Sequence, residues 1–292
     1  MFAVAVIAFL TVLLSADEAL AWGPATHLEL GREVLGNLGL IAAPVRPLLE
    51  RFPYDFLYGN ISADIVVGKN LVEELKHCHN WRIGFRLLKK THSDSQRAFA
   101  YGYLCHLAAD TVAHNLFIPE MMIRSFKTRM LRHIYWELRF DALADKRVWR
   151  LPEKIGRSMN GDNDRLLESL FEDTPFSFKT NKRIFSGMIN LHKIERWHRM
   201  MGLISKTSKW TIDGADKRRY FDLAMDAVQA VLRDGEHACC TAVDPTGRLS
   251  IHSAKTARRR LKAMRRYGLD WEKEMDRALA ELSPPPARTV NE

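Results

Sequence analysis

The sequence predicts an all-α fold arranged as a single multi-helix domain. From Trp22 onward the apolar side chains recur at helical spacing, and no stretch shows the sustained alternation of apolar and polar residues that is typical of a half-buried strand. The chain has 292 residues, 47% of them hydrophobic and 27% charged, which excludes a disordered or fibrous protein. Because it contains no internal repeat and no long linker, we expect one domain over residues 22–283 and a flexible tail over 284–292.

The segment before Trp22 has the pattern of a cleavable signal peptide. An apolar run extends from Phe2 to Leu14, and residues 19–21 read Ala-Leu-Ala, which is an A-x-A cleavage site. The run is shorter than the ~20 apolar residues that a membrane-spanning helix needs. We therefore expect residues 1–21 to be removed and the protein to be exported, either secreted or periplasmic.

Helices are expected in order along the mature chain. The first begins at Pro24, a residue suited to a first helical turn, and ends at the prolines of residues 44–47. A loop then carries residues 58–64, and Asn80 is a plausible cap for the helix that follows it. The expected helices after that loop cover residues 81–88, 94–117 (stopped by Pro119), 120–149, 163–173, 182–206, 214–234, 250–267 and 270–282.

The charge favours an anionic partner. The formal net charge is +9, from 44 Lys and Arg against 35 Asp and Glu. Removing residues 1–21 deletes Asp17 and Glu18 and no basic residue, so the mature chain carries +11. Charge alone does not distinguish nucleic acid, an acidic membrane surface and a phosphate-bearing substrate. The four cysteines are too few for a disulfide scaffold and form no paired CxxC zinc motif.

Histidines gather in the first half of the chain. Seven of the eleven lie between His27 and His133, and the densest part places His106, Asp110 and His114 at intervals of four residues. On an α-helix these positions share one face, so they would form a single stripe of nitrogen and oxygen donors, as a pair of zinc ions requires. The alternative is a buried polar stripe satisfied by hydrogen bonds.

Further donors flank this stripe. His133 and Glu137 form another pair at i and i+4, which can bind zinc from one helix face. Because this pattern is common by chance, it is evidence for a zinc site only together with the first stripe. His77 and His79 add two imidazoles that, taken singly, have the pattern of surface histidines. Asp64 adds a carboxylate in the expected loop.

Signal cleavage would create one more ligand. A cut after Ala21 makes Trp22 the mature N-terminus, and its free amine and carbonyl can chelate a metal ion. His27 follows one helical turn later. The expected cleavage site therefore coincides with a potential metal ligand.

Together these residues resemble the zinc-dependent phospholipase C family, whose fold and metal site are shared with the single-strand-specific zinc nucleases. The resemblance implies an all-α fold that holds up to three zinc ions with nine ligands in the order W, H, D, H, H, D, H, H, E/D. The resemblance covers about residues 22–141. The HxxxE pair matches the phospholipase branch of the family, whereas the Trp-to-His separation matches the nuclease branch. Candidates occur here in the family's order: Trp22, His27, Asp64, His77 or His79, His106, Asp110, His114, His133 and Glu137.

Two positions depart from the family pattern. The family's reference enzymes have five residues between the helix Asp and the next His, whereas three separate Asp110 from His114. For the fourth ligand, His77 fits an H-x-x-(D/N) pattern with Asn80, and His79 fits the nuclease-like spacing. We favour His79 slightly and keep both as candidates.

The resemblance also implies a mechanism in which Asp110 bridges two zinc ions and zinc-activated water hydrolyses a phosphodiester. Asp64 is either a ligand or the general base. We expect a monomeric phospholipase C-type hydrolase that cleaves phospholipid head groups; the alternatives are a single-strand nuclease or nucleotidase of the same fold, acting on nucleic acid, and a non-catalytic lipid- or protein-binding relative. By resemblance, the first zinc ion takes Asp64, His77 or His79, His106 and Asp110, the second takes Asp110, Trp22 and His27, and the third takes His114, His133 and Glu137.

A basic cluster on the expected helix 250–267 offers a peripheral contact with an anionic membrane. Each basic side chain near such a surface adds about 1 kcal/mol to binding. A solvated helix face is the alternative. The cluster consists of Arg258, Arg259, Arg260, Lys262, Arg265 and Arg266.

Overall fold

The computed structural model describes residues 22–41, 43–65, 78–128, 133–151, 154–155, 161–171, 178–183 and 210–282. Every regular element in these ranges is helical and none is a strand, which confirms the predicted all-α fold. The expected signal peptide, most of the expected helix 182–206 and the C-terminal tail lie outside the described residues. Within the described part, no helix combines the length and the apolar character needed to cross a bilayer.

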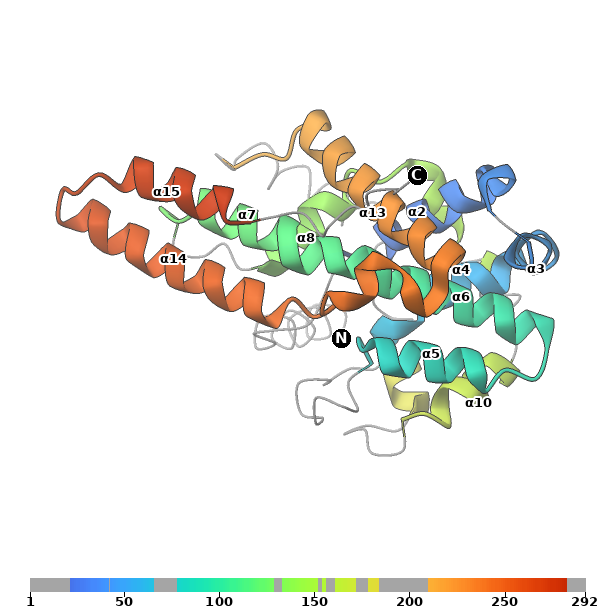
Figure 1. Cartoon of the computed structure of the whole chain (residues 1–292). Helices are drawn as coiled ribbons and strands as arrows, with labels where there is room; N and C mark the ends of the chain where they lie inside the picture. Colours follow the sequence, from blue (N-terminus) through green and yellow to red (C-terminus); the bar gives the residue numbers. More distant parts are fainter. Residues whose placement is uncertain are drawn as a thin grey trace, which may run out of the picture.

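The helices form a bundle around α6 (Figure 1). A π-helical turn, η5 (Ala113–Phe117), joins α6 directly to α7. The α-helices are α2 (Pro24–Gly36), α3 (Val45–Arg51), α4 (Pro53–Ser62), α5 (Trp81–Lys89), α6 (Asp94–Val112), α7 (Ile118–Arg124), α8 (His133–Asp141), α10 (Gly161–Glu168), α13 (Gly214–Asp234), α14 (Arg248–Arg266) and α15 (Trp271–Ala280).

The central helix α6 is enclosed by α4, α5 and α13. Nearly every side chain from Ala98 to Val112 is buried, so this helix is covered on all sides, unlike an amphipathic surface helix. Ser93 caps its N-terminus, because the Ser93 hydroxyl accepts the N–H of Gln96 at 3.2 Å. The polar residues near the end of α6 are therefore held far from water.

The expected loop over residues 58–64 is wrong, because most of it belongs to α4 and its end to the short 3₁₀ helix η2 (Ala63–Ile65). Gly59 marks a helix crossing instead of a turn. A Cβ atom at Gly59 would lie 2.0 Å from the carbonyl oxygen of Phe99 in α6, and Gly102 of α6 meets α4 in the same way. The two backbones touch, which brings the end of α4 and the following η2 against the middle of α6.

Other boundaries also differ from the expectation. The first helix ends at Gly36, before residues 44–47, and α3 begins at Val45. Pro119 does not stop a helix but lies in the first turn of α7, directly after the π-helical turn η5. The expected helix 120–149 is divided among α7, α8 and a 3₁₀ helix, Lys146–Arg150. The C-terminal helices agree much better, since α13 covers residues 214–234 as predicted.

The last two helices form a hairpin that projects from the bundle (Figure 1). α14 and α15 lie side by side, and both pack on α7 near the base of the hairpin. Leu261 and Ala278 are buried in this contact region, whereas most other side chains of the two helices reach the surface. The hairpin therefore carries exposed surface well away from the central helix.

Candidate metal centre

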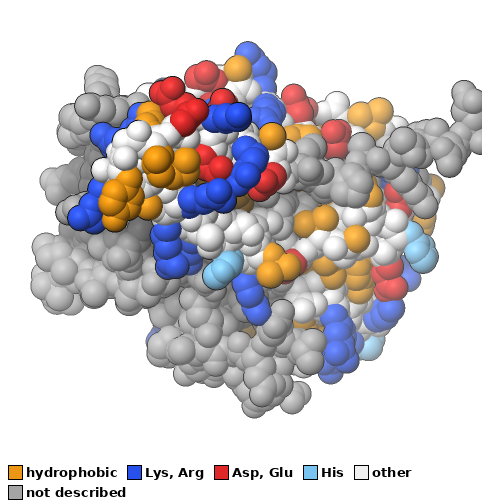
Figure 2. All heavy atoms as spheres, turned by 60° about the vertical axis from the view of Figure 1, so that its left-hand side comes forward, with side chains coloured by type: hydrophobic (Ala, Val, Ile, Leu, Met, Phe, Trp, Pro, Cys, Tyr) orange, Lys and Arg blue, Asp and Glu red, His pale blue; other side chains and the backbone are white. Residues whose placement is uncertain are grey.

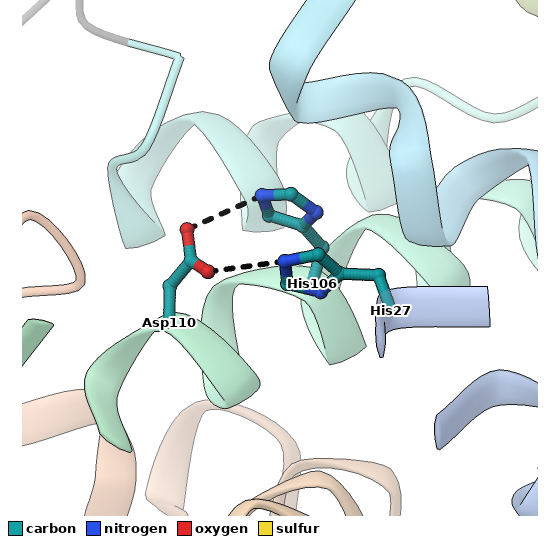
Figure 3. Close-up of side chains that lie close together, drawn as sticks. All are labelled: His27, His106 and Asp110. Atoms are coloured by element: carbon teal, nitrogen blue, oxygen red, sulfur yellow. Dashed lines mark ion pairs between the residues drawn. The ribbon is translucent and has the colours of Figure 1, made fainter. Parts of the chain in front are cut away.

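Five buried metal-binding side chains converge beside the central helix. Figure 3 shows three of them, two from α6 and one from α2, pointing toward one another. The close crossing of α4 and α6 brings in the η2 carboxylate, and the fifth side chain lies just before α5. The five are His27, Asp64, His79, His106 and Asp110.

Asp110 lies between two groups of donor atoms. Its Oδ2 is 3.1 Å from His79 Nε2 and 3.2 Å from His106 Nε2. Its Oδ1 is 3.3 Å from His27 Nε2, and Asp64 Oδ1 is 3.3 Å from His79 Nε2. The donor atoms of His27, His106 and Asp110 all lie within 4.8 Å of one another, as do those of Asp64, His79 and His106. One carboxylate therefore contacts both groups.

The contacts have the arrangement expected around a metal ion. His79 Nε2 and His106 Nε2 are 3.0 Å apart, close to the separation of about 3.3 Å between ligand atoms of a tetrahedral zinc site. Although His27 Nε2 lies 3.3 Å from Asp110 Oδ1, the two are not aligned for a hydrogen bond, and neither Asp110 oxygen is hydrogen-bonded within the described residues. Buried polar atoms are ordinarily satisfied, so these residues fit a bound cation.

A backbone carbonyl orients His106 toward the centre. His106 Nδ1 lies 2.9 Å from the carbonyl oxygen of Asn60 in α4. Because a carbonyl only accepts, Nδ1 carries the proton and Nε2 presents its lone pair to the other donors. The His27 ring stacks on the His106 ring, with centroids 3.9 Å apart and planes 16° apart, so each ring restricts the other.

His79 is positioned by its neighbours in sequence. The Tyr103 hydroxyl of α6 donates to the carbonyl oxygen of Cys78, which ties this segment to the central helix. The predicted cap is confirmed on the other side, because the Asn80 side chain accepts the N–H of Arg82 at 2.8 Å and starts α5. His79 is therefore fixed between a tyrosine anchor and a capped helix.

The protonation states suit metal binding. Burial lowers the pKa of His27, and the nearby His106 lowers it further, so His27 is neutral. Burial by itself raises the pKa of Asp110, but His106, followed by His27 and His79, lowers it well below its usual value, so Asp110 stays ionised. Neutral imidazole and ionised carboxylate are the forms that bind metal ions.

His114 lies in the helical turn that directly follows α6. After Val112 the chain enters the π-helical η5, and His114 is the second residue of this turn. Its Nδ1 lies 2.6 Å from the carbonyl oxygen of Pro245, in the loop before α14. His114 is buried but belongs to neither donor group found in the described residues. The expected role of His114 as a ligand, together with His133 and Glu137, therefore stays a prediction.

The remaining sequence candidates are Trp22, Glu137, His77 and His133. The Trp22 ring is fully buried and stacks on Phe140, with centroids 4.7 Å apart and planes 14° apart. Glu137 is buried in α8. His77 and the His133 side chain lie outside the described residues, so the choice between His77 and His79, and the third ligand set, stay predictions.

A buried aspartate that the sequence did not single out supports the start of α2. Asp141, at the end of α8, accepts the N–H of Thr26 at 2.7 Å, its hydroxyl at 2.9 Å and the N–H of Ala25 at 3.4 Å. A Cβ atom at Gly23 would lie 2.4 Å from the Asp141 carboxylate, so a larger residue there would displace this carboxylate. Asp141 thus joins α8 to the helix of His27. The sequence offers one signal for Asp141, which is its position four residues after the candidate ligand Glu137. Because HxxxE patterns are common by chance, this spacing does not single out a further carboxylate.

Comparison with known proteins agrees with this geometry. A family model described as zinc dependent phospholipase C matches residues 26–185, which include all five converging side chains. Neither a search of curated proteins nor a search of solved structures returned a match. The matched segment ends before α13, α14 and α15.

Proposed function

The chain belongs to the zinc-dependent phospholipase C family, and from that premise we propose that it is an exported zinc hydrolase that cleaves the head-group phosphodiester of phospholipids. The observation that carries this proposal is the position of Asp110, whose two carboxylate oxygens each contact a different group of buried donors. A carboxylate shared between two metal sites is suited to multi-metal hydrolysis of a phosphodiester.

The converging side chains divide into two sets of ligands. Asp64, His79, His106 and Asp110 would hold one zinc ion, and Asp110 and His27, with the amine of Trp22 after processing, would hold a second. Bound zinc supplies a water molecule with a pKa near 7 and neutralises charge on the phosphate. A third zinc ion, on His114, His133 and Glu137, follows from the family pattern.

The protein's own groups then have separate tasks. Asp110 stays ionised and holds the two sets of ligands together. Asp64 is 6% exposed, whereas His27, His106 and Asp110 are fully buried, so Asp64 lies nearest to water. Asp64 would therefore serve either as a zinc ligand or as the general base that accepts the proton of the attacking water. The surrounding apolar side chains of α6 keep other water from the buried donors.

Metal analysis of the processed protein, beginning at Trp22, tests the proposal most directly. We expect up to three zinc ions per chain. Asp110→Asn and His106→Ala should each abolish hydrolysis of phosphatidylcholine with only a modest loss of helicity by circular dichroism, because each removes a ligand without breaking the helix. A folded wild-type protein without metal, or wild-type turnover by either variant, would contradict it.

Two further measurements address the substrate and the export. Hydrolysis of phosphatidylcholine compared with single-stranded DNA separates the phospholipase from the nuclease of the same fold. Zinc bound without turnover of either substrate would favour the non-catalytic relative. N-terminal sequencing of protein recovered outside the cytoplasm should begin at Trp22, and an unprocessed N-terminus would remove Trp22 from the ligands.

A further inference from the structure

The α14–α15 hairpin ends in an exposed apolar tip, residues 265–269. Tyr267 is 72% and Leu269 is 55% exposed. The backbone fixes this exposure, because Gly268 adopts φ +67° and the N–H of Leu269 donates to the carbonyl oxygen of Met264 at 2.9 Å. In such a helix end the residue after the glycine usually packs on the last turn. Here more than half of its surface stays in water, so the tip displays apolar side chains on a rigid turn.

The helix after the tip is anchored to the bundle. The Trp271 ring packs on Phe126, with centroids 5.2 Å apart, and Lys127 Nζ lies 4.0 Å from the centre of the same ring. These contacts tie the start of α15 to the segment that follows α7. The tip is therefore held firmly against the folded domain, as a docking element requires.

Positive charge predominates on the helix that leads to the tip. Residues 248–269 contain eight Lys and Arg and no Asp or Glu, and the first acidic residue after the tip, Asp270, caps α15. Arg265 and Arg266 are exposed, and within the described part of the chain neither forms an ion pair. Other members of the basic cluster are engaged, since Arg260 pairs with Glu274 of α15 at 3.2 Å and Arg258 donates to the carbonyl oxygen of Thr128.

We propose that this tip binds the surface of an anionic phospholipid bilayer, with Arg265 and Arg266 at the lipid phosphates and Tyr267 and Leu269 in the interfacial layer. Apolar side chains beside unpaired cations are what such an interface accommodates. Figure 2, turned toward the hairpin end, shows hydrophobic side chains next to Lys and Arg side chains on this face. The inference rests on the proposed function, because the tip would hold the hydrolase at the bilayer that contains its phospholipid substrate.

Vesicle co-sedimentation tests the proposal with the processed, metal-loaded protein. The vesicles contain phosphatidylcholine alone or phosphatidylcholine mixed with phosphatidylglycerol. Arg265→Gln/Arg266→Gln should weaken binding to the mixed vesicles about 25-fold, since each arginine contributes about fivefold, and should barely change binding to the neutral ones. Tyr267→Ser/Leu269→Ser should weaken binding to both kinds by about tenfold or more.

Matched controls separate the tip from general charge and hydrophobicity. Arg82→Gln/Arg86→Gln removes two exposed charges from α5, which lies away from the hairpin (Figure 1), and Leu40→Ser removes an apolar side chain that is 73% exposed. Both controls should bind vesicles like the wild type. Equal losses in the controls, or undiminished binding by both tip variants, would overturn the proposal.

A soluble substrate keeps this proposal distinct from the proposed function. Both tip variants should hydrolyse monomeric short-chain phosphatidylcholine at the wild-type rate while losing activity on vesicles. Tip-dependent vesicle binding without any lipid hydrolysis would support the docking surface and refute the hydrolase. Binding of single-stranded DNA that depends on the tip, with no vesicle binding, would refute the membrane contact and assign the tip to nucleic acid.

Discussion

The contact between Gly59 and Gly102 links helix packing directly to the metal centre. In Gly102→Ala, the new Cβ would lie 2.0 Å from the carbonyl oxygen of Phe56, whereas ordinary contacts begin at 3.4 Å, so α4 and α6 must part by about 1.4 Å. The 2.9 Å hydrogen bond from His106 Nδ1 to Asn60 would then break. Overpacking costs about 1–3 kcal/mol and the lost bond about 1 kcal/mol, so the free energy of unfolding should fall by about 2–4 kcal/mol.

Zinc affinity is the more informative measurement for this variant. Loss of the carbonyl that orients His106 should weaken zinc binding by about 10–100-fold in a competitive chelator titration. Urea unfolding of the zinc-free protein gives the change in stability separately. Gly36→Ala is the matched control, because a Cβ there meets no atom within 4 Å; it should leave zinc affinity unchanged and raise the free energy of unfolding by no more than about 1 kcal/mol. A Gly102→Ala protein with lowered stability and wild-type zinc affinity would refute the link between crossing and centre.

Two other substitutions test the supports of the site, and a third, Gly268→Ala, is a control for one of them. Burial raises the pKa of Asp141 to about 7 from 3.8, so the folded protein binds the extra proton between these values. The free energy of unfolding should therefore fall by up to about 4 kcal/mol as pH rises from about 4 to 7, and Asp141→Asn should flatten this dependence in zinc-free urea titrations; an unchanged slope would exclude Asp141 as its source. Gly247→Ala combines a φ of +56° with a Cβ 2.4 Å from the carbonyl oxygen of His114, so it should destabilise by about 2–4 kcal/mol. Gly268→Ala, which has a similar φ and open space, should lose only about 1–2 kcal/mol, and equal losses would show that the His114 contact is unimportant.

The sequence predicts the peripheral helices well because their own residues determine their ends. α13 begins where Asp213 accepts the N–H groups of Ala215 and Asp216, and it ends at Gly235, which has φ +56°. The error over residues 58–64 has the opposite cause. Gly59 is typical of a turn when only its neighbours in sequence are considered. In the structure it allows α6 to approach α4, and this contact joins residues about forty positions apart in the sequence.

The candidate site likewise contains residues whose proximity the local sequence predicts and residues whose proximity depends on tertiary packing. Asp110 and His106 are one turn apart, so their proximity follows from helical periodicity alone. The approach of His27 and Asp64 to this pair depends on how α2, η2 and α6 pack, and the sequence supported it only through resemblance to a family. Asp141 escaped notice because a carboxylate that caps a helix 115 residues away leaves no local pattern.

The C-terminal half of the chain orients the candidate ligand His114. His114 lies in the π-helical turn η5, and its ring contacts the loop before α14. Since the Pro245 carbonyl can only accept, His114 Nδ1 carries the proton, and a metal ion bound by His114 would be bound through Nε2. The same loop is fastened to η5 by Asn115, whose Nδ2 donates to the carbonyl oxygen of Asp244 at 2.8 Å. Residues beyond the region that carries the family's motif therefore orient one of its candidate ligands, so the C-terminal helices belong to the same functional unit as the metal centre.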